Sequence, residues 1–307
     1  MRPKSICAVI VIFNPQVKEL LRNLNAISRQ VDSLVIVDNS DKETIGKLKQ
    51  VFEKEKNIFY LKNNENIGLA AAQNLGIHMA FKEGFEFTIL FDQDSMPEQH
   101  MVAELVSAYI RKEKQDKKII GVGPYFLDPR SNLVPCSIRF GLLGIKRTPI
   151  GESKNDRMVK TEFLVSSGLM FRTAHIVEMG VMDERLFIEH IDTEWCLRAR
   201  KRGRSLYLVR SARMIHQLGS RVTRYWFFGW RYLAMNLPFR NYYIFRNSVL
   251  LYKRPGVYWL WKYNDLLRLL KLFLANILVG DRRLDRIGFS LRGVWDGFRG
   301  VSGKVLL

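Results

Sequence analysis

Apolar residues recur along the first part of the chain in two forms, as short continuous runs and at helical spacing. The runs at residues 5–13, 33–37 and 87–91 are typical of strands buried on both faces of a parallel sheet. Apolar residues three and four positions apart predict helices over 17–27 and 69–81. This alternation of strand and helix predicts a doubly wound α/β sheet with right-handed crossovers.

The same two patterns extend the prediction along the chain. Between residues 125 and 159 the pattern dissolves into Gly, Pro and basic residues, which predicts a long loop. The other predicted elements are a helix at 42–56, a strand at 58–61, a helix at 97–112, strands at 119–124 and 161–165, a helix at 191–202 and a strand at 206–209.

Polar side chains follow the predicted strands. Asn14 follows the first strand, Asp38 the second, and Asp92 and Asp94 come after the run at 87–91. Open α/β sheets bind ligands at these strand ends. Two carboxylates one residue apart suit a divalent cation such as Mg²⁺, which keeps open positions for phosphate oxygens. The alternatives are a polar turn that caps the next helix and, at Asp38, a turn-forming cluster.

A small-residue helix is predicted directly after Gly68. Three alanines would let this helix approach a ligand or a neighbouring element closely. Asn66 before the helix and Asn74 within it carry amide groups suited to a ribose or a base. The chain has no Gly-x-Gly-x-x-Gly and no Gly-Lys-Ser/Thr, so the dinucleotide and P-loop mechanisms lack their glycines.

The net charge of +19 is unevenly distributed. The last 87 residues hold sixteen Lys and Arg against four Asp and Glu, together with five of the six Trp. This shift predicts a catalytic domain over 1–220 and a helical basic and aromatic appendage over 221–307. Such composition suits anionic lipid headgroups and also nucleic acid.

The apolar segment 266–278, which contains Arg268 and Lys271, favours a helix lying in a membrane interface. The alternative is packing against the catalytic domain or a second subunit, as in a homo-oligomer. No run reaches the about 18 apolar residues of a membrane span. Three distant cysteines without Cys-x-x-Cys spacing predict reduced thiols in a cytosolic protein.

The order of the motifs resembles family 2 glycosyltransferases with the GT-A fold, and more narrowly the bacterial rhamnosyltransferases that build cell-surface polysaccharides. Asp-Gln-Asp-Ser together with Asp-x-Glu-Trp-Cys-Leu-Arg is the most telling pair. The matching motifs are Val9-Ile-Val-Ile-Phe-Asn-Pro15, Val37-Asp-Asn-Ser40, Asn64-Glu-Asn-Ile-Gly68, Phe91-Asp-Gln-Asp-Ser95, Ser166-Ser-Gly168, Phe187 with Ile191-Asp-Thr-Glu-Trp-Cys-Leu-Arg198, His216 with Gly219, and Tyr243-Ile-Phe-Arg-Asn247.

The resemblance implies a role for each matching position. Asp192 would be the general base of an inverting transfer, and Asp38 would recognise a pyrimidine base. The nucleotide-sugar residues would be Asn14, Asp38, Asn66, Gly68, Asn74, Asp92 and Gln93; the acceptor and sugar pocket would hold Ser167, Gly168, Trp195 and Arg198; and Asp94, Asp92 and His216 would ligate Mg²⁺ or Mn²⁺.

The implied reaction transfers L-rhamnose from dTDP-L-rhamnose to a lipid-linked or growing cell-surface polysaccharide. The enzyme would be cytoplasmic and peripheral on the inner face of the bacterial plasma membrane, bound through its C-terminal segment. UDP-galactofuranose and UDP-N-acetylglucosamine remain alternative donors. A nucleic-acid-binding protein would explain the basic tail, but carboxylates at successive strand ends repel phosphate, so no nucleic acid partner is expected.

Overall fold

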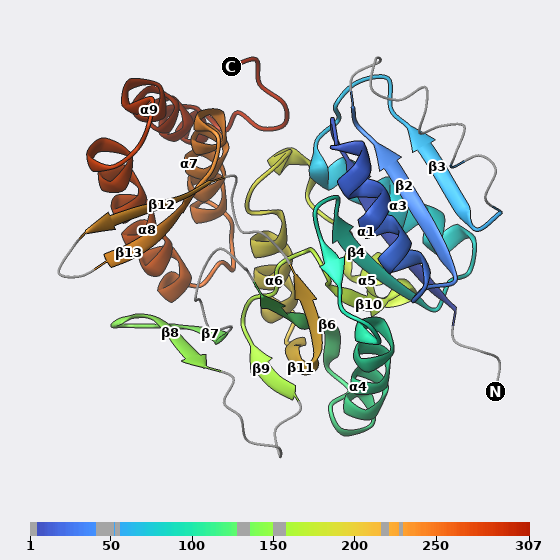
Figure 1. The fold of residues 1–307 in the computed structure, drawn as a ribbon. Coiled ribbons are helices and arrows are strands. Elements are labelled where there is room, and N and C mark those ends of the chain that lie inside the picture. Colours follow the sequence, from blue (N-terminus) through green and yellow to red (C-terminus); the bar gives the residue numbers. More distant parts are fainter. Residues whose placement is uncertain are drawn as a thin grey trace.

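The computed structural model places a mixed β-sheet beside a helical C-terminal region (Figure 1). The residues that it describes are 5–40, 52, 56–127, 136–149, 158–215, 221–226 and 230–307. The predicted helix at 42–56 and parts of the predicted loop at 125–159 lie outside them.

The N-terminal part of the sheet is parallel. Its strands run in the order β3-β2-β1-β4. Their bounds are β1 Ile6–Ile12, β2 Ser33–Asp38, β3 Ile58–Lys62 and β4 Phe87–Asp92. Each strand covers the apolar run from which it was predicted, and the carboxyl ends of all four lie at one edge of the sheet.

Two hydrophobic cores lie on opposite faces of this sheet, because successive side chains of a strand point to opposite faces. Odd-numbered β1 residues such as Val9 join one core and even-numbered ones such as Ile10 join the other. Helices α1 (Val17–Ser28) and α4 (Met101–Gln115) cover the second core. The first is covered by α3 (Leu69–Lys82), α5 (Thr173–Met179) and α6 (Ile191–Lys201).

The rest of the sheet is mixed. Strand β10 (Met170–Arg172) lies antiparallel between β4 and β6 (Ile119–Leu127). Strand β11 (Ser205–Ile215) runs parallel to β6 and pairs antiparallel with β5 (Met96–Pro97) and β9 (Met158–Thr161). The strand predicted at 161–165 is therefore wrong in position, because Thr161 ends β9. The helix predicted from residue 97 begins at Met101, because β5 uses residues 96–97.

A β-hairpin occupies part of the region predicted as a loop. Strand β7 (Cys136–Gly141) pairs antiparallel with β8 (Gly144–Pro149) in a separate two-stranded sheet. The prediction of a structureless loop over 125–159 is wrong at these residues. The two strands are short and partly exposed, and a glycine lies on each side of the turn. No continuous apolar run therefore marked these strands in the sequence.

The C-terminal region comprises a hairpin and three helices. The hairpin strands are β12 (Arg221–Trp226) and β13 (Trp230–Met235), and the helices are α7 (Pro238–Tyr252), α8 (Trp259–Leu278) and α9 (Arg283–Arg299). Helices α7 and α9 pack closely at Gly293 and Gly297 of α9, where an added Cβ atom would meet the backbone of α7. None of the helices in the described ranges is both long and apolar enough to cross a membrane.

Candidate active site

The turn after β4 carries Asp92, which is partly buried, and Asp94, which is exposed. The hydroxyl of Ser167 accepts a hydrogen bond from the Asp92 N–H (3.1 Å) and bonds the Ser95 hydroxyl (2.7 Å). The Ser95 N–H donates to the Asp92 carbonyl (3.1 Å). Ser167 is fully buried, so it fixes the shape of the aspartate turn from beneath.

Gly168 joins this turn to the middle of the sheet. Its N–H donates to the Leu90 carbonyl (2.7 Å), and its φ of +79° favours glycine. A Cβ atom there would lie 2.5 Å from the Pro124 ring. Gly168 is thus needed for close packing of β4 and β6, while the sugar contact predicted for it stays a prediction.

The ends of β1, β2 and β4 converge at one edge of the sheet. The Gln93 side chain accepts from the Phe13 N–H (2.8 Å) and donates to the Phe13 carbonyl (3.3 Å). The Asn14 N–H donates to the Ser40 hydroxyl (2.9 Å). The side chain of Gln93 therefore positions two strand ends relative to each other.

Asp38 is completely buried at the end of β2. One carboxyl oxygen accepts from the Tyr60 hydroxyl (2.5 Å) and the other from the Ser40 N–H (2.7 Å), with the Lys62 ammonium 3.7 Å away. The carboxylate is thus bonded within the protein, and the contact to a pyrimidine base stays a prediction.

Gly68 packs against the segment that precedes α6. Its φ is +90°, its N–H donates to the Asn66 side chain (2.9 Å), and a Cβ atom would lie 2.5 Å from the Phe187 ring. The Leu69 N–H donates to the Phe187 carbonyl (2.7 Å). The predicted nucleotide loop and the loop before Asp192 are therefore in direct contact.

Asn74 lies farther along α3 and is 2% exposed. Its amide donates to the Met182 carbonyl (2.9 Å) and the Glu184 carboxylate (2.8 Å), and its oxygen accepts from the Met182 N–H (2.8 Å). These bonds join α3 to residues 182–184, which gives Asn74 a structural role apart from the nucleotide contact predicted for it.

Asp192 lies in the first turn of α6, where its carboxylate accepts from the Thr193 N–H (2.7 Å). Burial raises the pKa of Asp192 to about 6, and the negative charges of Glu189 and Asp92 contribute to the increase. Asp192 also has a backbone hydrogen bond with Ser166, and the neighbouring Ser167 bonds Asp92, so the end of β4 and the start of α6 lie close together. A carboxylate with this raised pKa is a stronger proton acceptor than an ordinary Asp.

The loop before α6 is held in an unusual backbone conformation. Phe187, Glu189 and His190 all have positive φ, between +61° and +66°, which is unfavourable for residues with side chains. The buried Asn247 of α7 donates to the carbonyls of Leu186 (3.0 Å), Ile188 (2.8 Å) and Glu189 (2.9 Å). Asn247 thus positions the segment that presents Asp192.

Two further α7 residues support the same loop. Arg246 is buried and donates to the Leu186 carbonyl (3.0 Å) and the Gly303 carbonyl (2.7 Å). Tyr243 stacks on Phe187 with ring centroids 5.2 Å apart. The Tyr243–Asn247 motif therefore acts from the C-terminal region on the catalytic loop, while the predicted domain division at residue 220 stays a prediction.

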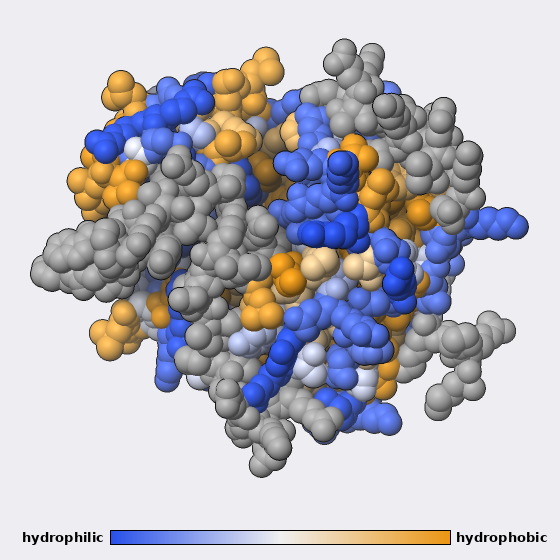
Figure 2. All heavy atoms as spheres, viewed as in Figure 1, coloured by the Kyte–Doolittle hydropathy of each residue, from blue (hydrophilic) through white to orange (hydrophobic). Residues whose placement is uncertain are grey.

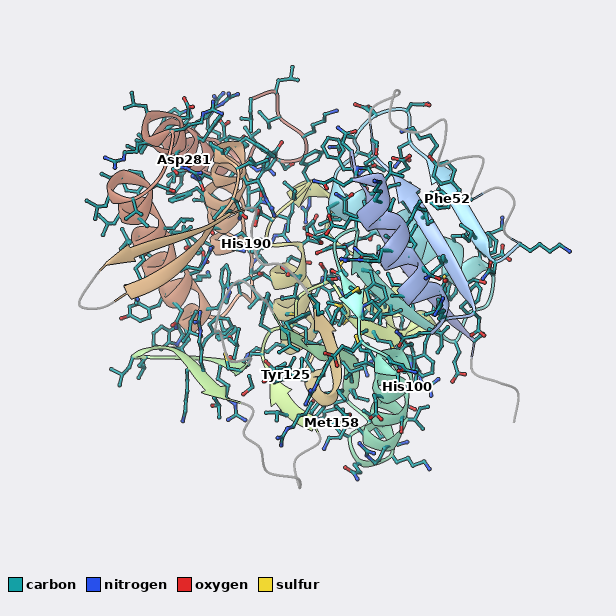
Figure 3. The ribbon with its side chains drawn as sticks, viewed as in Figure 1. Phe52, His100, Tyr125, Met158, His190 and Asp281 are labelled. Atoms are coloured by element: carbon teal, nitrogen blue, oxygen red, sulfur yellow. The ribbon has the colours of Figure 1, made fainter. Side chains whose placement is uncertain are left out.

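A cavity of about 320 Å³ adjoins Asp192. Figure 3 shows His190, one of its lining residues, between the C-terminal helices and the sheet. The cavity is lined by Ile138, Phe140, Ile145, Arg147, Phe163, Glu189, His190, Asp192, Thr193, Trp261, Asp265 and Arg268. Apart from Asp192, none of these was predicted from the sequence to be a site residue.

Two residues predicted for the acceptor side do not line this cavity, and their role there stays a prediction. Trp195 is fully buried in the core beneath the sheet. Arg198 bonds Glu194 and the carbonyls of residues 179–181, and it lines a different cavity near the start of α8. Neither lines the cavity beside Asp192. His216, predicted as a metal ligand, lies outside the described residues.

Asp92 and Asp94 offer the hard oxygen donors that Mg²⁺ or Mn²⁺ prefers. Within the described ranges no three His, Cys, Asp or Glu residues form a cluster able to hold a metal. Two carboxylates still suit an ion that takes its remaining ligands from phosphate and water, so these residues fit the predicted metal.

Comparison with known proteins shows the family of this chain. Residues 7–162 match the model of glycosyl transferase family 2. The chain belongs to this family. The family predicted from the motifs is thereby confirmed, and the protein is a glycosyltransferase.

This glycosyltransferase is 30% identical over 301 residues to the dTDP-rhamnosyl transferase RfbF of Shigella flexneri, with 97% of each chain covered. It is 21% identical to the low-salt glycan biosynthesis hexosyltransferase Agl10 of Haloferax volcanii, covering 96% of this chain and 92% of that one. The full-length similarity includes the C-terminal helices.

Solved glycosyltransferases share the fold. The mannosyltransferase PcManGT of Pyrobaculum calidifontis, in complex with GDP-Man and Mn²⁺, superposes with a TM-score of 0.57 at 12% identity, covering 100% of this chain and 77% of that one. S. aureus TarS 1–349 with UDP-GlcNAc also gives 0.57, at 14% identity, covering 97% and 81%. The predicted GT-A fold is confirmed.

Proposed function

We propose that this glycosyltransferase transfers L-rhamnose from dTDP-L-rhamnose, with inversion, to a hydroxyl of a lipid-linked or growing cell-surface glycan. Near full-length similarity to a dTDP-rhamnosyl transferase supports the donor. The observation that carries the mechanism is the position of Asp192 beside a cavity and next to Ser166 and Ser167, the second of which bonds Asp92.

The proposed reaction is a single displacement at the anomeric carbon. Asp192 accepts the proton of the acceptor hydroxyl. The hydroxyl oxygen forms the new bond to the anomeric carbon on the face opposite the diphosphate, and the bond to the diphosphate oxygen breaks to release dTDP. Attack from that opposite face inverts the anomeric configuration.

Asp94 and Asp92 would hold the divalent cation in this proposal. When bound, Mg²⁺ or Mn²⁺ supplies positive charge that balances the departing diphosphate. Ser167 and Ser95 keep the aspartate turn in shape, and this order lowers the conformational cost of binding.

Asp94→Ala is expected to abolish the Mn²⁺-dependent part of donor binding, because it removes one of the two carboxylates. Calorimetry with dTDP-L-rhamnose, with and without Mn²⁺, measures this part. A panel that includes UDP-galactofuranose and UDP-N-acetylglucosamine tests the donor in the same assay. Tight binding of a UDP-sugar without binding of dTDP-L-rhamnose would replace the proposed donor.

The C-terminal helices support the proposal of peripheral membrane binding. Figure 2 shows hydrophobic residues exposed at the upper left of the molecule, where α9 lies. Exposed basic residues such as Lys271 and Arg292 accompany them, which suits anionic lipid headgroups. The large apolar residues, each at least 40% exposed, are Trp259, Tyr263, Leu266, Leu270, Leu274 and Leu278 on α8 and Leu284, Leu291, Trp295 and Phe298 on α9 or its first turn.

A double substitution, Leu270→Glu with Leu274→Glu, is expected to reduce sedimentation with anionic phospholipid vesicles at least tenfold. Each leucine that becomes buried in the membrane contributes about 1.5–3 kcal/mol to binding, and a tenfold change in membrane affinity needs about 1.4 kcal/mol. The control is Leu75→Glu with Phe81→Glu on α3, two exposed apolar residues away from α8. Equal losses of vesicle sedimentation in both variants would show that membrane binding depends on the net charge and not on the leucines of α8.

A further inference from the structure

The β7–β8 hairpin covers the cavity beside Asp192 with one face. Ile138 pairs with Arg147 and Phe140 pairs with Ile145 across the two strands, and all four line the cavity. Lys146, between two lining residues, is not among the lining residues. Successive side chains of a strand point to opposite faces, so Lys146 lies on the outer face.

Helix α8 forms a second wall. Trp261, Asp265 and Arg268 line the cavity and recur at spacings of four and three, which places them on one face of the helix. Trp261 packs edge-on to His190, with ring centroids 6.1 Å apart, and is 3% exposed. The wall is therefore rigid and contains an aromatic side chain.

Most charges in the cavity are already neutralised by partners. Glu189 pairs with Arg240 (2.5 Å), and Asp265 pairs with Arg268 (2.7 Å). Burial lowers the pKa of His190 to about 4, so it is neutral. Among the described residues Arg147 has no ion-pair partner, which leaves its guanidinium available to a ligand.

The charges that line the cavity indicate which class of ligand it binds. The two lining charges without an ion-pair partner among the described residues are Asp192 and Arg147, which have opposite signs. The cavity therefore has no net charge that would offset the cost of desolvating an anionic or a cationic group. A neutral polyol can donate hydrogen bonds to the carboxylates and accept them from the guanidinium groups, while the apolar lining covers its C–H surface.

We propose that this cavity binds the terminal sugar of the acceptor glycan, a neutral pyranose whose reacting hydroxyl faces Asp192. The inference rests on the proposed function and adds the acceptor's chemical class and the residues that select it. The cavity volume of about 320 Å³ is near the lower end of the range for small-molecule sites, about 300–1,000 Å³. This volume suits one sugar ring. Most of its lining lies beyond residue 162, outside the family match, as expected for a specificity site.

The test uses the full chain with Mn²⁺, dTDP-L-rhamnose and a panel of methyl hexopyranosides as small acceptors. Neutral glycosides are expected to bind in saturation-transfer NMR and to increase dTDP release in a saturable manner, and the matching methyl hexuronides are not. Arg147→Glu should raise the KM for the neutral glycosides about tenfold, whereas Lys146→Glu should change neither that KM nor acceptor-independent donor hydrolysis. Ile145→Trp, which fills the cavity, should abolish their binding.

Lys146→Glu is the matched control, because it makes the same charge change on the outer face of β8. Equal effects of Arg147→Glu and Lys146→Glu, or neutral glycosides that bind unchanged to Ile145→Trp, would overturn the inference. So would wild-type protein that hydrolyses the donor but ignores every neutral glycoside. Absence of any dTDP-L-rhamnose turnover, with glycosides still bound, would instead remove the proposed donor and leave the sugar site standing.

Discussion

Asp192→Asn is expected to lower kcat for sugar transfer by about 10²- to 10⁴-fold, the usual contribution of a general base. The affinity for the donor nucleotide sugar should remain that of the wild type, because the amide keeps the size of the carboxylate and Asp192 contacts the acceptor side. Steady-state kinetics and donor titration on the same preparation measure the two effects separately. Wild-type kcat in this variant would refute the assignment of the base.

The pH profile provides an independent check on Asp192. Its pKa is raised to about 6, so the carboxylate is protonated and inactive as a base below that pH. The rate of the wild type should therefore fall below about pH 6, and the residual rate of Asp192→Asn should not. His190 does not explain such a limb, because burial lowers its pKa to about 4.

Asn247→Ala is expected to produce the largest effect of any change outside the site itself. It removes the Asn247 donor from the Ile188 and Glu189 carbonyls, while the Leu186 carbonyl keeps its bond from Arg246. An unsatisfied buried group costs about 1–3 kcal/mol. Thermal unfolding should show lower stability, and kcat should fall because the positive-φ loop no longer presents Asp192 correctly.

Asn241→Ala is the matched control for Asn247→Ala. Asn241 lies on the same helix and is equally buried, but its amide nitrogen has no hydrogen-bond partner among the described residues. The control should retain kcat. If both alanine variants lose activity in proportion to stability, the bonds of Asn247 serve the fold and not the loop.

Sequence patterns predicted the strand ends well, because a buried strand needs a continuous apolar run and must be followed by polar residues. Asn14, Gln93 and Asp92 converge at one edge of the sheet for this reason. The patterns did not reveal that Ser167 lies beneath the aspartate turn, since a buried serine and a ligand-binding serine look alike in a sequence.

Trp195 and Arg198 show a limit of the motif resemblance, which implied that both shape the acceptor side. They lie three and six residues after Asp192, about 60° and 120° away from it around the helix axis. Each turn advances about 5.4 Å along the helix axis. Only the first turn of α6 reaches the cavity, and Trp195 is already beneath the sheet. Depth along the axis depends on how the helix packs, which no local pattern records.

The cavity beside Asp192 escaped prediction because four distant segments build it. One local signal was present. Alternating Ile138-x-Phe140 and Ile145-x-Arg147 flank the four residues Gly141-Leu-Leu-Gly144, and a short linker that contains Gly between two such runs indicates a hairpin. The contributions of Trp261 and Arg268 depend on the docking of α8 and had no such signal.

Helix α8 would set the height of the proposed sugar site above a membrane. One side of α8 lines the cavity beside Asp192 and the opposite side carries the exposed leucines, and a helix with its side chains is about 10–12 Å across. With those leucines resting on lipid, the cavity would lie about one helix width above the bilayer. A lipid-linked acceptor would then reach the cavity without leaving the membrane.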